Sequence, residues 1–161
     1  MKTVLMVCHA NTARSVMAHV LLERMLARHG VDDGAIRVRS GGIANYARDG
    51  MIASLDARLA LREEGILLGE NDFVSTDLRR HRDHLAGADL ILTMTVLQKQ
   101  MLAAFDEVRD RPVFTLREFV GEEGDIDDPA TQGEDVFRAC RDEIKRCLEK
   151  SVPRLLMLLS G

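Results

Sequence analysis

The sequence predicts a single-domain α/β protein with a four-stranded, mainly parallel, twisted sheet and helices on both faces. The chain has 161 residues, about the length of one domain, and its composition (46% apolar, 30% charged) is that of a globular protein. Short apolar runs alternate with amphipathic stretches, which is the pattern of strand–helix units on a parallel sheet. No repeat, linker or low-complexity segment divides the chain, so we expect residues 1–161 to form one domain.

The first elements are a short apolar strand and an amphipathic helix. Residues 3–7 (TVLMV) form a continuous apolar run, which is typical of a buried strand. Between 15 and 28 the apolar residues recur at helical spacing, and Gly30 ends the pattern. A second strand is expected at 36–40 (IRVRS), where two glycines follow it.

The rest of the chain continues this alternation of helices and strands. The charged run at 79–84 (RRHRDH) is expected to be a solvated helix face. The other expected elements are a helix at 51–64, strands at 88–94 (ADLILTM) and 111–116 (RPVFTL), and a final helix from Glu134 to Arg146 or beyond that bends near Pro153.

Charge and cysteine content narrow the class of protein. A net charge of −4 offers no general basic field for nucleic acid. No stretch approaches the roughly 18 apolar residues of a membrane-spanning helix, and the N-terminal apolar run is too short for a secretory signal. Three cysteines without a paired spacing are typical of a reducing compartment. We therefore expect a cytoplasmic protein that binds neither nucleic acid nor membrane. Its oligomeric state stays open.

The loop after the first expected strand concentrates reactive side chains. Cys8, Arg14 and Ser15 form the pattern C-x5-R-S between the strand and the following helix. Backbone N–H groups at a helix N-terminus bind anions, and their positive potential stabilises a thiolate. Arg14 has the reach to grip two oxygens of a phosphate-sized oxyanion, and the Ser15 hydroxyl can donate to the sulfur. Asn11 is a residue type that tolerates left-handed backbone. The loop therefore indicates a nucleophilic cysteine at an anion site.

The spacing alone is a weak signal, because Cys140 and Arg146 repeat it. That second copy lies in a strongly helical stretch and is followed by Cys147 rather than by a hydroxyl residue. The context therefore favours Cys8 as the nucleophile. The alternative interpretation is that Cys8 is a small apolar residue at the end of a strand.

A nucleophilic route to phosphate release also needs a proton donor for the leaving group. Asp128 lies before Pro129 in the loop 124–135, and the proline biases Asp128 toward an extended conformation. Asp125 and Asp127 are competing donors in the same loop. An Asp-Pro pair before a helix is also an ordinary turn, so the residues alone leave this role open.

With these residues together, the chain resembles the low-molecular-weight protein tyrosine phosphatase family over nearly its whole length. The segments 37–43 (RVRSGGI) and 88–95 (ADLILTMT) are similar to the ends of that family's second and third strands. The resemblance implies Cys8 as nucleophile, Arg14 as phosphate-binding residue and Asp128 as general acid and then base, with no metal or cofactor. It also implies the remaining phosphate-site residues His9, Ala10, Asn11, Thr12, Ala13, Ser15 and Ser40, of which Asn11 and Ser40 shape the loop and Ser15 assists the leaving thiolate.

A narrower resemblance is to the bacterial protein arginine phosphatase branch. Thr12 stands where that branch has threonine and tyrosine-directed members have an isoleucine-like residue. The resemblance implies a phosphorylated protein substrate, with phosphoarginine favoured and phosphotyrosine possible. Asp128 would then pair with the planar guanidinium before it donates a proton.

The sequence departs from the family pattern at several positions of the expected site. Ala10 replaces a loop glycine, so a left-handed backbone there would be strained. Ala13 replaces a second cysteine, and Val16 replaces a proline at the start of the helix. Ala130 replaces an aromatic residue, which removes one wall of the substrate slot. Tyr46, the only tyrosine, lies in a loop expected to border the same slot.

Two other functions fit the same scaffold. An arsenate reductase would use the same loop, but a thioredoxin-coupled one needs two further cysteines, and Cys140 and Cys147 lie about 10 Å apart along an expected helix. A phosphoprotein-binding module without turnover would keep Arg14 but has no chemical need for a thiolate at Cys8. Both alternatives remain open from the sequence.

Overall fold

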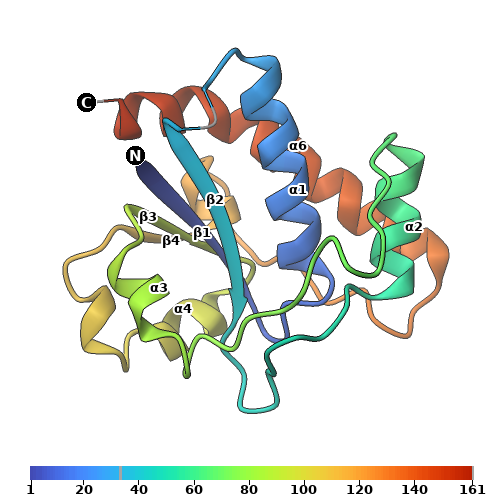
Figure 1. Ribbon diagram of the computed structural model, residues 1–161, viewed down its shortest axis with the longest axis horizontal. Coiled ribbons are helices and arrows are strands. Elements are labelled where there is room, and N and C mark those ends of the chain that lie inside the picture. The colour runs from blue at the N-terminus through green and yellow to red at the C-terminus, as the bar shows by residue number, and fades with distance from the viewer. Residues whose placement is uncertain (33, 161) are drawn as a thin grey trace.

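A four-stranded parallel sheet forms the centre of the protein, in a computed structural model that describes residues 1–32 and 34–160 (Figure 1). The strand order is β2-β1-β3-β4, and every neighbouring pair runs parallel. The predicted α/β class with a parallel sheet is therefore confirmed. The strands are β1 (Lys2–Cys8), β2 (Ile36–Gly42), β3 (Leu90–Thr93) and β4 (Val113–Thr115).

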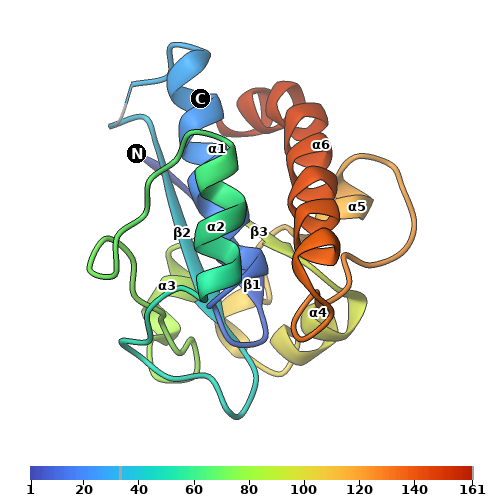
Figure 2. The same cartoon turned by 90° about the vertical axis from the view of Figure 1, so that its right-hand side faces the viewer.

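Helices cover both faces of the sheet, as the sequence predicts (Figure 1). Figure 2 shows α2 lying along the outer side of the layer that α1 and α6 form. The helices of this layer are α1 (Arg14–Arg28), α2 (Leu55–Glu63), α5 (Leu116–Phe119) and α6 (Glu134–Leu159). The opposite layer contains α3 (Arg82–Ala86), α4 (Val96–Leu102) and the 3-10 helix η1 (Asp106–Val108).

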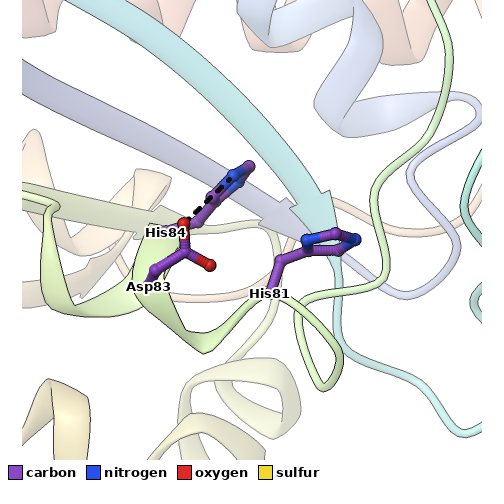
Figure 3. Close-up of side chains that lie close together, drawn as sticks. All are labelled: His81, Asp83 and His84. Carbon is purple, nitrogen blue, oxygen red and sulfur yellow. Dashed lines mark ion pairs between the residues drawn. The ribbon is translucent and has the colours of Figure 1, made fainter.

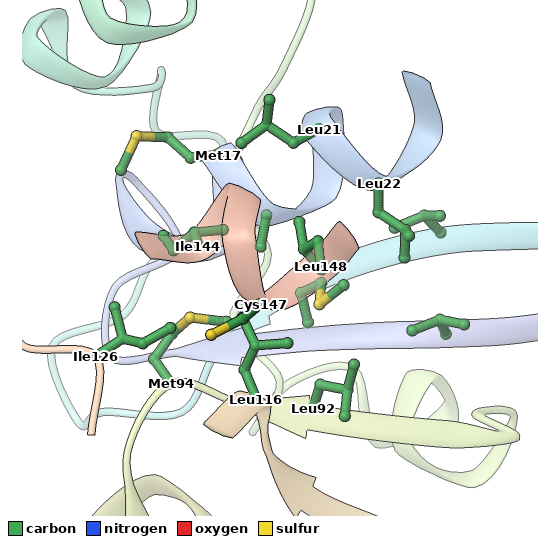
Figure 4. Packing of buried hydrophobic residues seen from close by; sticks show 14 of the residues in the cluster. Met17, Leu21, Leu22, Leu92, Met94, Leu116, Ile126, Ile144, Cys147 and Leu148 are labelled. Carbon is green, nitrogen blue, oxygen red and sulfur yellow. The ribbon is translucent and has the colours of Figure 1, made fainter. Parts of the chain in front are cut away.

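Strand β1 is buried on both faces and divides the interior into two apolar clusters. Val4, Met6 and Cys8 pack against α1 and α6, whereas Leu5 and Val7 pack against the opposite layer. This alternation follows from the two-residue repeat of a strand. Figure 4 shows the larger cluster, where side chains from α1, α6 and the sheet interdigitate. Cys8, at the carboxyl end of β1, is therefore itself part of the larger apolar cluster.

The structure corrects several expected boundaries. The helix expected at 51–64 begins only at Leu55, because the Ser54 side chain caps it by accepting a hydrogen bond from the N–H of Ala57. The strands expected at 88–94 and 111–116 are shorter than predicted. Thr95 follows β3 and caps α4, and Thr115 is the last residue of β4 and caps α5. Each threonine forms a capping box with the short helix that it begins. These boxes were visible in the sequence, so a search for capping signals could have found α4 and α5.

The charged run at 79–84 differs from the expected continuous helix face. Only Arg82 to His84 of this run are helical, and His81 is the N-cap of α3. The final helix α6 extends well beyond Arg146 and contains Pro153 within it. Among the described residues, no helix is long and apolar enough to cross a membrane.

Candidate active site

The loop 8–15 connects the carboxyl end of β1 to the N-terminus of α1. Cys8 is the last residue of β1, and Arg14 is the first residue of α1. The N-cap Ala13 makes no capping hydrogen bond, and the first turn of α1 contains no acidic residue. The free N–H groups and the positive end of the helix dipole therefore face the loop, which is the arrangement of a phosphate-binding site.

A buried hydrogen-bond network fixes the sulfur of Cys8. The Asn11 backbone N–H donates to Cys8 Sγ at 3.3 Å, and Ser15 Oγ lies 2.9 Å from the same sulfur. Asn11 Nδ2 donates to Ser15 Oγ at 2.8 Å, while Asn11 Oδ1 accepts from the Thr76 N–H at 2.9 Å. The Asn11 amide fills one acceptor position of the Ser15 oxygen, and once Cys8 is deprotonated the Ser15 hydroxyl is the donor of the contact with the sulfur. The network therefore brings the Asn11 N–H and the Ser15 hydroxyl to the sulfur of Cys8.

The backbone of the loop turns at Asn11 rather than at Ala10. Asn11 has a φ of 62°, whereas Ala10 has no positive φ, so the strain expected at Ala10 is absent. Asn11 tolerates the left-handed region because its short polar side chain bonds locally. Gly42 allows β2 to approach the loop closely, since a Cβ there would lie 2.7 Å from the His9 carbonyl oxygen.

Arg14 and Asp128 bring a guanidinium and a carboxylate to the same site. Arg14 Nη1 donates to the Ile126 carbonyl at 2.8 Å, and Arg14 Nη2 lies 4.0 Å from Asp128 Oδ2. The Arg14 side chain is 4% exposed, whereas that of Asp128 is 54% exposed. The loop 124–133 before α6 thus holds the Arg14 guanidinium in place, and the Asp128 carboxyl stays accessible to a bound molecule.

The structure distinguishes between the three acidic residues that the sequence left as competing donors. Asp125 accepts a hydrogen bond from the Val96 N–H at 2.9 Å, which turns it toward α4. Asp127 does not line the cavity above Cys8, whereas Asp128 does. Asp128 also accepts a hydrogen bond from the Ala130 N–H at 3.0 Å, which orients its carboxyl group.

A cavity of about 300 Å³ opens above Cys8. Tyr46 borders it as predicted, although the aromatic wall expected after Pro129 is missing at Ala130. Phe137 of α6 and Asp56 of α2 also line the cavity and were not predicted from the sequence. Both residues lie on helices far from the loop 8–15 in the sequence, and nothing in their neighbouring residues indicates that they line this cavity. The predicted site residues in the lining are Cys8, His9, Ala10, Thr12, Ala13, Arg14 and Asp128.

The hydroxyl of Ser40 bonds to α1 rather than to the loop that Ser40 is expected to shape. Its hydroxyl lies 2.8 Å from Nδ1 of His19 in α1. The register of the sheet explains the difference, because Ser40 lies opposite Met6, two residues before Cys8. Asn11 is instead held by the backbone of Thr76.

The electrostatic environment of the cavity is set by the loop charges. Burial lowers the pKa of His9, and the positive charge of Arg14 lowers it further, with Asp128 opposing. Burial raises the pKa of Tyr46, and the nearby Asp128 and Cys8 add to this shift. Both side chains are therefore neutral near pH 7. Arg14 remains the positive side chain of the cavity lining.

Known proteins resemble this chain over almost its whole length. Residues 3–157 match the family described as low molecular weight phosphotyrosine protein phosphatase. The chain is 36% identical over 154 residues to the protein-arginine-phosphatase of Geobacillus stearothermophilus, covering 94% of this chain and 95% of that protein. It is 30% identical over 127 residues to the low molecular weight protein-tyrosine-phosphatase PtpB of Staphylococcus aureus, covering 78% and 79%.

Solved structures show the same similarity. A YwlE mutant from Bacillus subtilis superimposes with a TM-score of 0.85 at 35% identity, covering 96% of this chain and 99% of that one. A second structure is a cysteine-to-serine mutant of YwlE arginine phosphatase whose active-site serine is phosphorylated. It has a TM-score of 0.84 at 34% identity and covers 96% and 95%.

Proposed function

The chain belongs to the low molecular weight phosphotyrosine protein phosphatase family, and we propose that it hydrolyses phosphoarginine in proteins through a phosphocysteine intermediate. Its relatives are named as protein-arginine and protein-tyrosine phosphatases, so the protein is a hydrolase of the protein phosphatase class. The observation that carries the mechanism is the network around Cys8. A sulfur that accepts from the Asn11 N–H and contacts the Ser15 hydroxyl at the positive end of a helix dipole is arranged to react as a thiolate nucleophile.

In the first step, Cys8 Sγ attacks the phosphorus atom and the bond from phosphorus to the leaving group breaks. The N–H groups of the loop and the Arg14 guanidinium bind the non-bridging oxygens, where negative charge accumulates. Asp128 donates its proton to the departing nitrogen or oxygen, since its carboxyl is accessible at the mouth of the cavity.

In the second step, water attacks the phosphorus of the phosphocysteine. Asp128, now ionised, accepts a proton from this water, and the thiolate of Cys8 leaves as inorganic phosphate forms. The Ser15 hydroxyl supports this step because its hydrogen points at the departing sulfur. The phosphorylated serine of the similar YwlE mutant supports a covalent intermediate at the corresponding position.

The preference for phosphoarginine rests on the composition of the cavity above Cys8. Asp56 and Asp128 both line the cavity, and their carboxyl oxygens offer acceptors for the several N–H groups of a guanidinium, which a phenol lacks. Thr12 lies in the same lining and is held by its carbonyl, which accepts a hydrogen bond from the Ser54 N–H at 2.8 Å. The higher identity to arginine phosphatases than to PtpB agrees with this preference.

The test is a side-by-side measurement of phosphate release from phosphoarginine and phosphotyrosine peptides. We expect the wild type to favour phosphoarginine, Cys8→Ser to lose turnover, and Asp128→Asn to lose about 10²- to 10⁴-fold in kcat, as expected for a general acid. Thr12→Ile should shift the preference toward phosphotyrosine. Thr12→Val, which keeps the shape but lacks the hydroxyl, separates a steric effect from a polar one.

Each possible result of this assay has a defined meaning. Turnover of phosphotyrosine alone would contradict the arginine assignment and leave the general family activity in place. A fully active Cys8→Ser variant would contradict the cysteine mechanism. Release from neither peptide would favour arsenate reduction with an external thiol or phosphate binding without turnover. Coupled reduction by an internal cysteine pair is disfavoured because Cys140 and Cys147 both lie within α6.

A cytoplasmic location belongs to the same proposal. Cys8, Cys140 and Cys147 are all free thiols, and a catalytic thiol requires a reducing compartment to stay active.

A further inference from the structure

Away from the phosphate cavity, a second group of reactive side chains lies at the start of α3. His81 is the N-cap of this helix, and Asp83 and His84 follow in its first turn. One ligand atom from each of the three lies within 4.8 Å of those of the others. Figure 3 shows the three side chains projecting from the same turn of the chain. Two imidazoles and a carboxylate are a donor set that Zn²⁺ and similar ions accept.

The His81 ring is already oriented by a carboxylate behind it. His81 Nε2 lies 2.9 Å from Asp49 Oδ2, and Asp49 Oδ1 accepts a hydrogen bond from the Asp77 N–H at 2.8 Å. Nδ1 of His81 is therefore the nitrogen left to bind an ion. Histidine ligands of metals typically donate their other ring N–H to a carboxylate in this way, which fixes both the tautomer and the ring orientation.

The geometry of His84 and Asp83 also fits a shared ion. His84 Nε2 lies 3.9 Å from Asp83 Oδ2, which is too long for a hydrogen bond. Two ligands of one tetrahedral Zn²⁺, each at about 2.0–2.2 Å from the metal, lie about 3.4 Å apart. The Asp83 side chain is 79% exposed, so a small rotation closes this difference.

Ion pairing reduces the positive charge around the cluster. Arg82 Nη2 pairs with Glu107 Oε1 at 2.7 Å, and Arg79 Nε pairs with Asp77 Oδ1 at 3.2 Å. Both guanidiniums are thus bound to carboxylates outside the three-residue group. These two ion pairs offset part of the positive charge of the run 79–84, whereas Arg39 and Arg37 of β2 still act on His84.

We propose that His81, Asp83 and His84 bind one divalent transition-metal ion of the Zn²⁺ class, through His81 Nδ1, His84 Nε2 and an Asp83 carboxylate oxygen, with water as the fourth ligand. This site is separate from the phosphate cavity and takes no part in the phosphatase mechanism. The two sites are linked only through one loop. Asp49 contacts His81 and lies in the same loop as Tyr46, which borders the cavity. A bound ion fixes His81 and, through Asp49, this loop.

Calorimetric titration with Zn²⁺ tests the proposal. The Cys8→Ser protein is the parent, because a reactive thiolate would itself bind zinc. We expect one ion per chain, and at least tenfold weaker binding in Cys8→Ser proteins that also carry Asp83→Ala or His84→Ala. Cys8→Ser with His29→Ala is the matched control, since His29 is an exposed histidine at the end of α1, and it should bind like the parent. Equal binding by all four proteins would overturn the proposal, and so would the absence of binding to the parent.

A spectroscopic titration identifies the ligands and the coupling to Tyr46. With Co²⁺ as the probe, nitrogen and oxygen ligands give visible d–d bands without the intense ultraviolet band of a thiolate ligand. That thiolate band would place the ion on Cys140 or Cys147 and contradict the assignment. The chain has one tyrosine and no tryptophan, so its intrinsic fluorescence reports on Tyr46 alone. We expect Zn²⁺ to change this emission in the parent, and the change to be lost with Asp83→Ala. Circular dichroism of each variant confirms that the fold is intact.

Discussion

Replacement of Asn11 tests how the phosphate-binding loop is held together. The Asn11 side chain is fully buried and bridges two segments, donating to Ser15 Oγ at 2.8 Å and accepting from the Thr76 N–H at 2.9 Å. Its backbone is left-handed, with a φ of 62°. Asn11→Ala removes both hydrogen bonds and leaves a residue with a Cβ but no local bonding in a left-handed conformation. Asn11→Gly removes the same hydrogen bonds but accepts the conformation freely.

The two variants separate the contribution of the side chain from that of the backbone. Each lost hydrogen bond costs about 1 kcal/mol net, so both variants should lose about 2 kcal/mol in the free energy of unfolding. A left-handed residue with a Cβ costs roughly 1 kcal/mol more, which brings the loss for Asn11→Ala to about 3 kcal/mol. Without the Asn11 amide, the Ser15 hydroxyl is free to rotate away from the sulfur of Cys8. Loss of about 1 kcal/mol of support for the thiolate corresponds to a fall of about fivefold in kcat.

Urea denaturation and steady-state kinetics on an aryl phosphate measure these two effects. The slope of unfolding free energy against urea should stay constant across the series, so that midpoints report stability directly. Ser15→Ala is the comparison variant, because it removes the hydroxyl and leaves the bond from Thr76 to Asn11 in place. If both Asn11 variants stay within 0.5 kcal/mol of the wild type (roughly the scatter of surface substitutions), the hydrogen-bond reasoning is wrong. If Asn11→Ala is as stable as Asn11→Gly, the backbone reasoning is wrong.

Two further predictions follow from a close contact and from an ion pair. Gly42→Ala places a Cβ 2.7 Å from the His9 carbonyl oxygen, so we expect a loss of about 1–3 kcal/mol in unfolding free energy and a shifted loop with a lower kcat. Gly34→Ala, where a Cβ meets open space, is its control, and equal kinetics in the two variants would contradict the prediction. Hydrogen bonds from Arg146 and Lys150 lower the pKa of Glu122 from 4.5 to about 2. A carboxyl with a depressed folded-state pKa stabilises the fold above its unfolded pKa and loses this contribution as the pH falls through the folded value. Wild-type stability should therefore decline between pH 4.5 and about 2 more steeply than that of Glu122→Gln in urea titrations across that range, and parallel profiles would refute this assignment.

Much of the fold and the heart of the candidate site follow from local sequence. The apolar run before Cys8 and the helical spacing after Arg14 were enough to predict a strand, a loop and a helix in order. Because the carboxyl end of a central parallel strand faces the ligand-binding edge of a sheet, this order also placed the candidate anion site. The competing spacing from Cys140 to Arg146 could be set aside for the same local reason, since it lies inside α6. Short helices such as α4 and α5 were missed, although their capping boxes were present in the sequence.

Only the tertiary structure decided which distant side chains complete the site. The sequence left Asp125, Asp127 and Asp128 as alternatives, and their positions depend on how the loop before α6 packs against α4 and Arg14. Ser40 was expected at the loop, but the register of β2 against β1 places it beside His19 instead.

The walls of the cavity were decided in the same way. Asp56 and Phe137 reach it because α2 and α6 pack together beside α1. The sequence by itself therefore brought together Cys8, Arg14 and Ser15, the proposed nucleophile, phosphate-binding arginine and supporting hydroxyl, because they share one loop and need only local geometry to meet. The cavity walls and the position of Asp128, the proposed proton donor, depend on packing between elements far apart in the chain. That packing is set by the burial of whole helix faces, so it cannot be predicted from a short pattern of residues.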